Sequence, residues 1–345
     1  MPALQARDGQ ISRNVDMTKY PAISTPIHHT PRPSTEIMST SPSLLPQTEL
    51  EPPPNTTTAH DLSQSGPLEY PQFILFGDSI TQFGTLTLQP YLQTQYIRRL
   101  DVINRGLSGF TSVMGLKALQ RILPSTSSPS SWPHIKLITI FFGANDACIP
   151  GEHQHVSLQS YIDTVREIIH YPVLQQQGSR RTQVIVITPP PVNEHQLVRM
   201  PSGSFQRRAG ITSQYARAVA EEGRINNIAV LDLWTILMRK VGWEESMGRE
   251  CCCKHIPYHM RPIRTTSATR VQHIPGCYHL APSSSDADYQ LSDFLTDGLH
   301  FTKLGYDVLY SELMKLIRRD LSEYAPENLP FVLPEWRDVL NLPNP

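Results

Sequence analysis

The chain has 345 residues, a formal net charge of −1 and an apolar fraction of 39%. It is long enough for one large domain, but it has few apolar residues for a chain that is folded throughout. It contains no basic run and no stretch of about 18 apolar residues, so neither nucleic-acid binding nor a membrane span is expected. The amino terminus lacks the apolar core of a secretory signal. Together with five cysteines that are poorly spaced for disulfides, this predicts a soluble, cytoplasmic protein.

Residues 1–68 are dominated by Pro, Ser and Thr and show no sustained apolar period. Such a segment buries too little surface to offset the entropy lost on ordering. We therefore expect a disordered N-terminal tail over residues 1–68, followed by one folded domain over residues 69–345.

Past residue 70, short apolar runs alternate with segments of helical period. Runs of this length are typical of strands buried on both faces, and the segments between them are long enough for crossover helices. The alternation predicts a five-stranded, mostly parallel sheet between two layers of helices. The predicted strands cover residues 73–76, 101–104, 136–142, 183–188 and 228–233.

Three longer segments carry a helical period, over residues 157–174, 205–224 and 303–321, and Thr302 is the expected N-cap of the last one. Residues 242–290 show no clear period of either kind. We interpret this block as an insertion, either a lineage-specific loop or retained intron sequence. Its cysteines lack the CxxC pairs typical of zinc sites, so no metal site is predicted there.

The first candidate site residue is Ser79, in the tripeptide Gly77-Asp78-Ser79 directly after the first predicted strand. Such a tripeptide is common in turns and alone does not indicate a site. Its place between a strand and a helical segment, however, puts it at the carboxyl end of a parallel sheet, where ligands bind. The motif G-x-S-x-G marks the nucleophile elbow of the α/β-hydrolases, and Thr81 stands where its second glycine would be, so this segment is not that elbow. We interpret Ser79 as a candidate nucleophile.

A serine nucleophile needs a base, and the base needs an acceptor that orients its other ring nitrogen. The tetrapeptide Asp297-Gly-Leu-His300, just before the last predicted helix, offers both groups. A turn acid beside a locally hydrogen-bonded histidine would give the same pattern. Since Thr302 is the better helix cap, Asp297 and His300 remain available as acceptor and base.

Ester hydrolysis also needs donors that face the developing oxyanion. Two turns after later strands supply candidates. Gly109 allows close approach of its backbone N–H, and Asn145 carries a neutral side-chain amide. Each alone is more often an ordinary turn. Their occurrence at successive strand ends indicates one shared site.

Together these segments resemble the SGNH (GDSL-type) hydrolase superfamily and, within it, the isoamyl acetate-hydrolysing esterase branch. The four superfamily blocks are, in order, Gly77-Asp78-Ser79, Gly109, Gly143-Ala-Asn145-Asp146 and Asp297-Gly-Leu-His300. The branch resemblance lies in FGDSITQFG, NRGLSGF, FFGANDACIP, ITPPPVNE, FLTDGLHFTKLGY and LPFVLPEWRDV. The matching stretches span residues 73–339. The resemblance implies a flavodoxin-like, three-layer α/β/α sandwich.

Carried over residue by residue, the resemblance implies Ser79 as nucleophile, His300 as general base and then acid, and Asp297 as the group that orients His300. Asp78 and Asp146 would hold their turns. The implied oxyanion donors are the backbone N–H groups of Ser79 and Gly109 and the side-chain amide of Asn145. No metal or organic cofactor is implied.

The predicted function is a serine esterase that hydrolyses short-chain esters, acetates such as isoamyl acetate above all, through an acyl-serine intermediate. Its partner is a small-molecule ester, and the branch resemblance suggests a homodimer. Two alternatives stay open. One is another activity of the superfamily, a lysophospholipase or a carbohydrate deacetylase. The other is a catalytically inactive binding protein, which the insertion before Asp297 favours and the complete set of site residues opposes.

Overall fold

A computed structural model describes residues 68–123, 134–176, 178–198, 206–243 and 289–340. The expected tail over residues 1–68 and the expected insertion over residues 242–290 lie almost wholly outside these ranges, so both stay predictions. Within the described ranges, no helix is long and apolar enough to cross a membrane.

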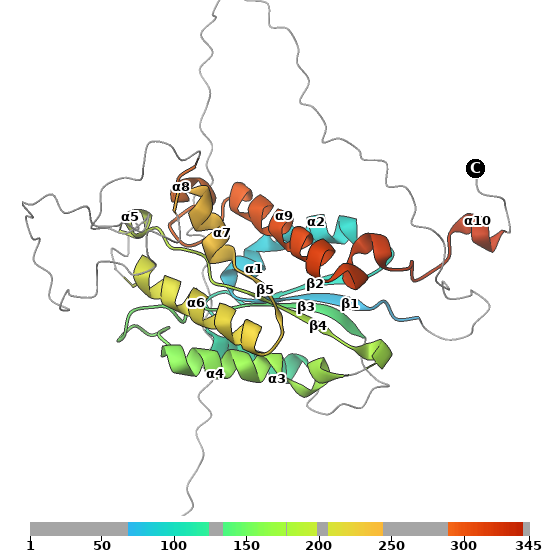
Figure 1. Cartoon of the computed structure of the whole chain (residues 1–345), viewed down its shortest axis with the longest axis horizontal. Helices are drawn as coiled ribbons and strands as arrows, with labels where there is room; N and C mark the ends of the chain where they lie inside the picture. Colours follow the sequence, from blue (N-terminus) through green and yellow to red (C-terminus); the bar gives the residue numbers. More distant parts are fainter. Residues whose placement is uncertain (1–67, 124–133, 177, 199–205, 244–288, 341–345) are drawn as a thin grey trace, which may run out of the picture. The chain divides into compact units, whose positions relative to one another are not determined.

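Five strands form one sheet in which every hydrogen-bonded pair is parallel (Figure 1). The strands are β1 (Gln72–Gly77), β2 (Asp101–Gly106), β3 (Ile135–Phe141), β4 (Gln183–Ile187) and β5 (Ala229–Leu231), in the order β2-β1-β3-β4-β5. The chain leaves β1 to one side for β2 and returns to its other side for β3. Open parallel sheets bind ligands at this reversal, outside the carboxyl ends of the strands. The predicted five-stranded parallel sheet is therefore confirmed.

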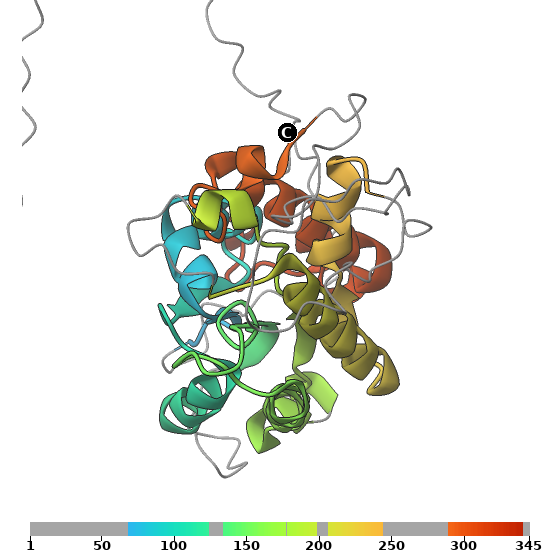
Figure 2. The same cartoon turned by 90° about the vertical axis from the view of Figure 1, so that its left-hand side faces the viewer.

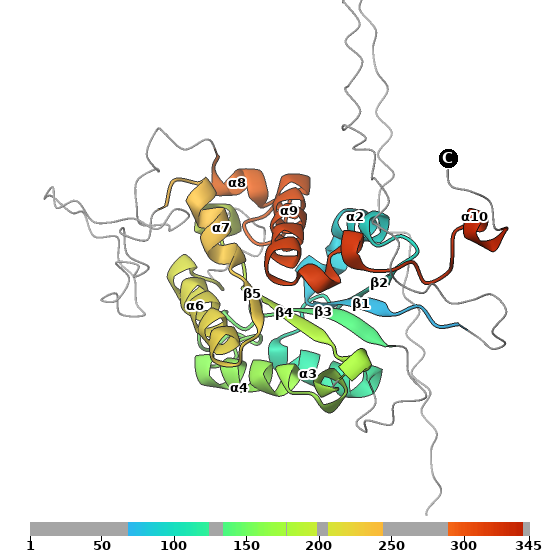
Figure 3. The ribbon, with the colours of Figure 1, turned by 45° about the vertical axis from the view of Figure 1, so that its right-hand side comes forward.

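Alternate residues of β1 point into two separate cores. Phe73 and Leu75 belong to one apolar cluster, and Ile74 and Phe76 belong to the other. Helices cover both faces, as a strand buried on both sides requires (Figures 1 and 3). Viewed from another side, α4 appears end-on and the orange and red C-terminal helices lie across the sheet from it (Figure 2).

The longer helices divide between these faces. On one side of the sheet lie α3 (Ser112–Ile122), α4 (Leu158–Ile169) and α6 (Ala209–Ile225), and on the other lie α2 (Leu88–Gln95), α7 (Leu233–Lys240) and α9 (Lys303–Asp320). The shorter helices are α1 (Ser79–Phe83), α5 (Glu194–Leu197), α8 (Leu291–Phe294) and α10 (Trp336–Val339). The single-turn 3-10 segments are η2 (Gly84–Leu86), η3 (Pro172–Gln175), η4 (Gly178–Arg180), η7 (Ser322–Tyr324) and η8 (Pro326–Asn328).

Two predicted helices differ at their ends from the observed ones. The predicted extension of α4 to residue 174 is wrong, because Pro172 starts a 3-10 turn instead. The predicted start of α6 at residue 205 is also wrong. Arg207 pairs with Cys148 in an isolated antiparallel bridge, and the Ile149 N–H donates to the Gln206 carbonyl at 2.8 Å. The predicted start of α9 is confirmed, since the Thr302 hydroxyl accepts from the Gly305 N–H.

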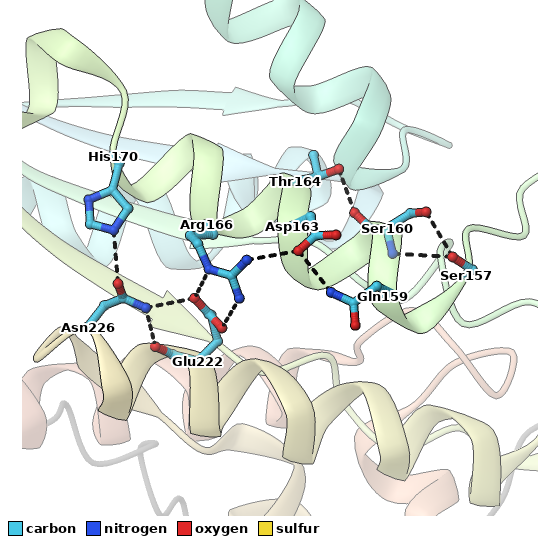
Figure 4. A network of polar contacts seen from close by, with 9 residues as sticks. All are labelled: Ser157, Gln159, Ser160, Asp163, Thr164, Arg166, His170, Glu222 and Asn226. Carbon is cyan, nitrogen blue, oxygen red and sulfur yellow. Dashed lines mark hydrogen bonds and ion pairs between the residues drawn. The ribbon is translucent and has the colours of Figure 1, made fainter.

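An ion-pair network joins α4 to α6 (Figure 4). The Arg166 guanidinium donates twice to Glu222, from Nε at 2.7 Å and from Nη2 at 2.8 Å, and once to Asp163. Asn226 donates to Glu222 and contacts His170. The Glu222 side chain is only 5% exposed, whereas Arg166 is 44% exposed. The network thus satisfies a buried carboxylate where the two helices meet.

Candidate active site

Ser79 lies where the chain turns from β1 into α1. Asp78 caps this helix, since its Oδ1 accepts the Ile80 N–H at 2.9 Å, and Ser79 is the first helical residue. The serine is 5% exposed. At the end of β2, a Cβ on Gly106 would lie 2.0 Å from the backbone nitrogen of Gln82. Only glycine therefore allows α1 to pack this closely against β2.

The loop between α8 and α9 brings His300 to Ser79. The Ser79 Oγ lies 3.0 Å from His300 Nε2, and His300 Nδ1 lies 2.7 Å from Asp297 Oδ2. A carboxylate can only accept, so Nδ1 carries the ring proton and Nε2 is left to accept from the serine hydroxyl. This arrangement can move a proton from Ser79 to His300 while Asp297 stabilises the resulting imidazolium.

Asp297 is held as a carboxylate. Its Oδ1 accepts the N–H groups of Leu299 at 2.9 Å and His300 at 2.8 Å. Partial burial raises the pKa of Asp297, but the bonds from the His300 ring and from these two N–H groups outweigh it, so the pKa lies below its ordinary value. The side chain is therefore charged at neutral pH and fixes the ring orientation of His300.

Contacts from α5 and its N-cap hold this loop in place, and α9, which follows the loop, bonds to α1. The Asn193 N–H donates to the Gly298 carbonyl at 2.9 Å, and Gln196 Nε2 donates to the Leu295 carbonyl at 2.8 Å. From α9, the Tyr306 hydroxyl donates to the Ile80 carbonyl at 2.7 Å. The helices that carry Ser79 and follow His300 are thus joined directly. Sequence reasoning did not assign these contacts, because their partners are far apart along the chain.

The candidate oxyanion donors lie in the neighbouring turns. Gly109 has φ +79°, a conformation that favours glycine. One N–H of the Asn145 amide donates to the Phe110 carbonyl at 2.9 Å, which leaves the other available. Among the described residues, no protein group accepts the backbone N–H of Ser79 or of Gly109. The turn after β1 is bonded to both neighbours, through Leu107 N–H to the Gly77 carbonyl and Asp78 N–H to the Phe141 carbonyl.

Two residues that sequence reasoning missed connect these turns. Arg207, 7% exposed, donates to the Ala144 carbonyl at 2.8 Å, to Asn145 Oδ1 at 2.8 Å and to Gln154 Oε1 at 3.0 Å. Gln154 Nε2 donates in turn to the Gly109 carbonyl at 2.8 Å. No sequence pattern singles out either residue, since both precede helices in irregular segments.

Two buried carboxyl groups lie beneath the site. Burial raises the pKa of Asp78 to about 7 in spite of the bond from the Ile80 N–H, and nearby Asp146 raises it further. Burial also raises the pKa of Asp146 to about 6, although Ser112 donates to it from both Oγ and N–H. Asp146 thereby ties the turn after β3 to the start of α3.

The apolar residues around the site differ in exposure. Phe83, 49% exposed, lies with its ring centroid 5.3 Å from that of His300. Cys148 and Val192 are buried, and Val192 belongs to the core. Within the described part of the chain, no three His, Cys, Asp or Glu side chains are grouped so as to hold a metal ion.

The chain is similar to known proteins over most of the described residues. The model of the GDSL-like lipase/acylhydrolase family matches residues 75–256. The isoamyl acetate-hydrolyzing esterase of Saccharomyces cerevisiae is 30% identical over 285 residues, which cover 79% of this chain and 97% of the yeast protein. The bovine isoamyl acetate-hydrolyzing esterase 1 homolog is 29% identical over 285 residues, covering 81% of this chain and 92% of the relative.

A solved lipase/acylhydrolase from Enterococcus faecalis covers 72% of this chain and 95% of its own, with 21% identity and a TM-score of 0.44. The family model alone spans more than half of the chain and includes Ser79, Gly109 and Asn145. The resemblance identified from the four sequence blocks is thereby confirmed. The chain belongs to the GDSL-like lipase/acylhydrolase family, a family of carboxylic ester hydrolases.

Proposed function

We propose that the protein is a serine esterase that hydrolyses short-chain carboxylic esters, acetates such as isoamyl acetate above all. The observation that carries the proposal is the relay from Ser79 Oγ to His300 Nε2 at 3.0 Å and from His300 Nδ1 to Asp297 at 2.7 Å. These contacts have the order and lengths that activation of a serine hydroxyl requires.

In the acylation step, His300 Nε2 takes the proton of Ser79 as Oγ attacks the ester carbonyl carbon. The carbonyl oxygen becomes an oxyanion, which accepts from the N–H groups of Ser79 and Gly109 and from the free amide N–H of Asn145. The bond from carbon to the alcohol oxygen then breaks. His300 returns its proton to that oxygen, the alcohol leaves, and the acyl group stays on Ser79.

Deacylation repeats these steps with water. His300 takes a proton from water, the hydroxide attacks the acyl carbon, and the bond to Ser79 Oγ breaks. The proton passes back to Oγ, and the carboxylic acid is released. Asp297 stays ionised throughout and stabilises the imidazolium that forms in both steps.

The acyl preference rests on the relatives. The yeast relative is named an isoamyl acetate-hydrolyzing esterase, and the mammalian relatives are named as its homologues. Phe83, partly exposed against the His300 ring, is an apolar group suited to contact a small alkyl chain. Acetate esters of small alcohols are therefore the proposed substrates.

The test measures hydrolysis of isoamyl acetate and of a chromogenic acetate by the full-length protein and by Ser79→Ala. The variant should lose activity by on the order of 10⁶-fold, because the serine carries the covalent step. Ser157→Ala, which removes the N-cap hydroxyl of α4, is the matched control: it can lower stability but should keep full activity in the folded protein.

A series of acyl lengths then tests the substrate. Rates that fall from acetate to long acyl chains support the proposal. Faster cleavage of lysophospholipids or of acetylated sugars would instead support the alternative activities. An active Ser79→Ala variant would contradict the assignment of the nucleophile, and a wild-type protein inert on every ester would favour a binding protein.

A further inference from the structure

We propose that Arg207 and Gln154 are positioning residues. Their hydrogen bonds form one network, the bracket, which orients the two candidate oxyanion donors outside the Ser79 turn: the Asn145 side-chain amide and the Gly109 backbone N–H. The inference rests on the esterase function proposed above. It concerns residues that lie outside the four superfamily blocks and that only the folded chain brings together.

The bracket decides which way the Asn145 amide faces. A guanidinium has donors and no acceptor, so the atom that meets Arg207 Nη2 at 2.8 Å has to be the amide oxygen. The carbonyl of Phe110 can only accept, so the amide nitrogen faces it at 2.9 Å. With both of these bonds fixed, the second N–H of Asn145 has a single direction left. Without Arg207, only the Phe110 carbonyl would still hold the amide, so the direction of the second N–H would be less well fixed.

The same logic applies to Gln154. Its oxygen meets Arg207 Nη2 at 3.0 Å, so its nitrogen faces the Gly109 carbonyl, which it reaches at 2.8 Å. This bond fixes a residue that has a left-handed backbone and little steric restraint, since a Cβ on Gly109 would meet nothing closer than 3.6 Å. The bonded carbonyl belongs to the peptide after Gly109, so Gln154 acts on the Gly109 N–H through the glycine Cα, by restraining the backbone on its far side. The orientation of Gln154 depends in turn on Arg207.

Arg207 is itself rigidly held. Its Nε donates to the carbonyl of Ala144, the residue before Asn145, and its backbone pairs with Cys148. Only 7% of the residue is exposed. Its three hydrogen-bond acceptors among the described residues are all neutral. A cation bonded to neutral acceptors polarises the Asn145 amide and strengthens its remaining N–H as a donor.

The test is a double-mutant cycle in the full-length protein, with saturation kinetics on the chromogenic acetate. Arg207→Met should lower kcat by about 10- to 100-fold, because a misplaced donor loses part of the 10²- to 10³-fold effect of an oxyanion contact. KM should change little. In the Asn145→Ala background the same substitution should cost only about 3- to 10-fold, because the Asn145 donor is already absent and only the route through Gln154 and Gly109 remains.

An equal loss in both backgrounds would overturn the inference, since it would show that Arg207 acts on the fold as a whole. Wild-type kcat in folded Arg207→Met would overturn it too. Arg166→Met is the matched control, because that arginine is also held by two side chains but lies in the α4–α6 network of Figure 4. It should leave kcat unchanged.

If Arg207→Met does not fold, the Gln154→Ala variant tests the inference instead. This half-buried side chain should be removable without unfolding, and its loss should lower kcat by about 3- to 10-fold while KM holds. Affinity for a trifluoromethyl ketone, which forms an oxyanion on Ser79, should fall by the same factor. Unchanged kcat and ketone affinity would overturn the inference. Ester hydrolysis by the wild type, abolished by Ser79→Ala, separates this failure from failure of the proposed function.

Discussion

Arg207 and Arg166 each bind side chains from other parts of the chain, but the bound side chains differ in charge. Arg207 is buried and binds two carbonyl-type side-chain oxygens and one backbone carbonyl, whereas Arg166 is half-exposed and binds the carboxylates of Glu222 and Asp163. In the α4–α6 network the carboxylates of Glu222 and Asp163 more than offset the charge of Arg166. Beside the site, neutral partners leave the charge of the guanidinium to act on its surroundings. The comparison predicts that changes near the site act on kcat and that changes between α4 and α6 act on stability.

Among changes that leave Ser79 in place, the largest effect should come from Asp297→Asn. The amide would offer a donor to His300 and favour the wrong ring tautomer, so kcat should fall by about 10⁴-fold with little change in melting temperature. Asp163→Asn, which alters a carboxylate of the α4–α6 network, should leave kcat unchanged. Comparable losses of kcat in the two variants would contradict the expected difference between the site and the α4–α6 network.

The next effect is that of Asn145→Ala, measured by kcat on the chromogenic acetate. Loss of one oxyanion donor should lower kcat by about 10²- to 10³-fold while thermal unfolding shifts little. Asn226→Ala, in the α4–α6 network, is its counterpart and should alter stability only. A loss confined to KM would show that Asn145 binds the ground state and not the oxyanion.

A pH experiment separates the carboxyl groups of the site. The pKa of Asp78 is raised to about 7, so between about pH 4 and pH 7 the folded protein holds a proton that the unfolded chain has lost. That contribution is complete below about pH 4 and disappears as the pH rises through 7, so the contribution of Asp78 to the free energy of unfolding should fall over this range by roughly 2–4 kcal/mol.

Asp78→Asn keeps an acceptor for the Ile80 N–H and removes the titration. Its stability relative to wild type, from urea unfolding, should therefore rise between pH 5 and pH 8. Asp297 has the opposite sign, because its pKa is lowered and its contribution is lost as the pH falls through that pKa. A flat difference between wild type and Asp78→Asn would show that Asp78 is ionised in the fold.

The smallest effect should be that of Glu222→Gln. The amide keeps the shape but weakens two charge-assisted bonds, so the free energy of unfolding should fall by about 1 kcal/mol at unchanged kcat. Glu221→Gln, in an exposed pair with Arg224, should change neither quantity measurably. A drop in kcat for Glu222→Gln would mean that the two networks are coupled.

The sheet could be predicted from sequence because its signals are local. Each predicted strand overlaps an observed one, and Ser79, Gly109, Asn145 and His300 were expected near one another because parallel strands end at one edge. Strand β5 is shorter than predicted for a local reason as well: Asp232 accepts the Thr235 N–H and starts α7 instead of continuing the strand.

The bracket of Arg207 and Gln154 could not be predicted in this way. Arg207 reaches Asn145 across 62 positions and Gln154 across 53, and it stands in a predicted helix that in fact begins two residues later. No periodicity in the sequence identifies a residue that acts by orienting the side-chain amide of another residue. Such contacts depend on where irregular segments cross, which only the tertiary structure reveals.

The distance between Ser79 and His300 along the chain also has a consequence for synthesis. The two residues are 221 positions apart, and all five strands precede His300. At about 5–20 residues per second, a ribosome needs on the order of 10–40 s to pass from one to the other. During that interval the nascent chain has its proposed nucleophile but not the histidine proposed as its base. Under the proposed mechanism, hydrolytic activity therefore begins only after His300 has been synthesised, and a premature stop before residue 297 yields a chain that carries the sheet strands but lacks the base and its acceptor.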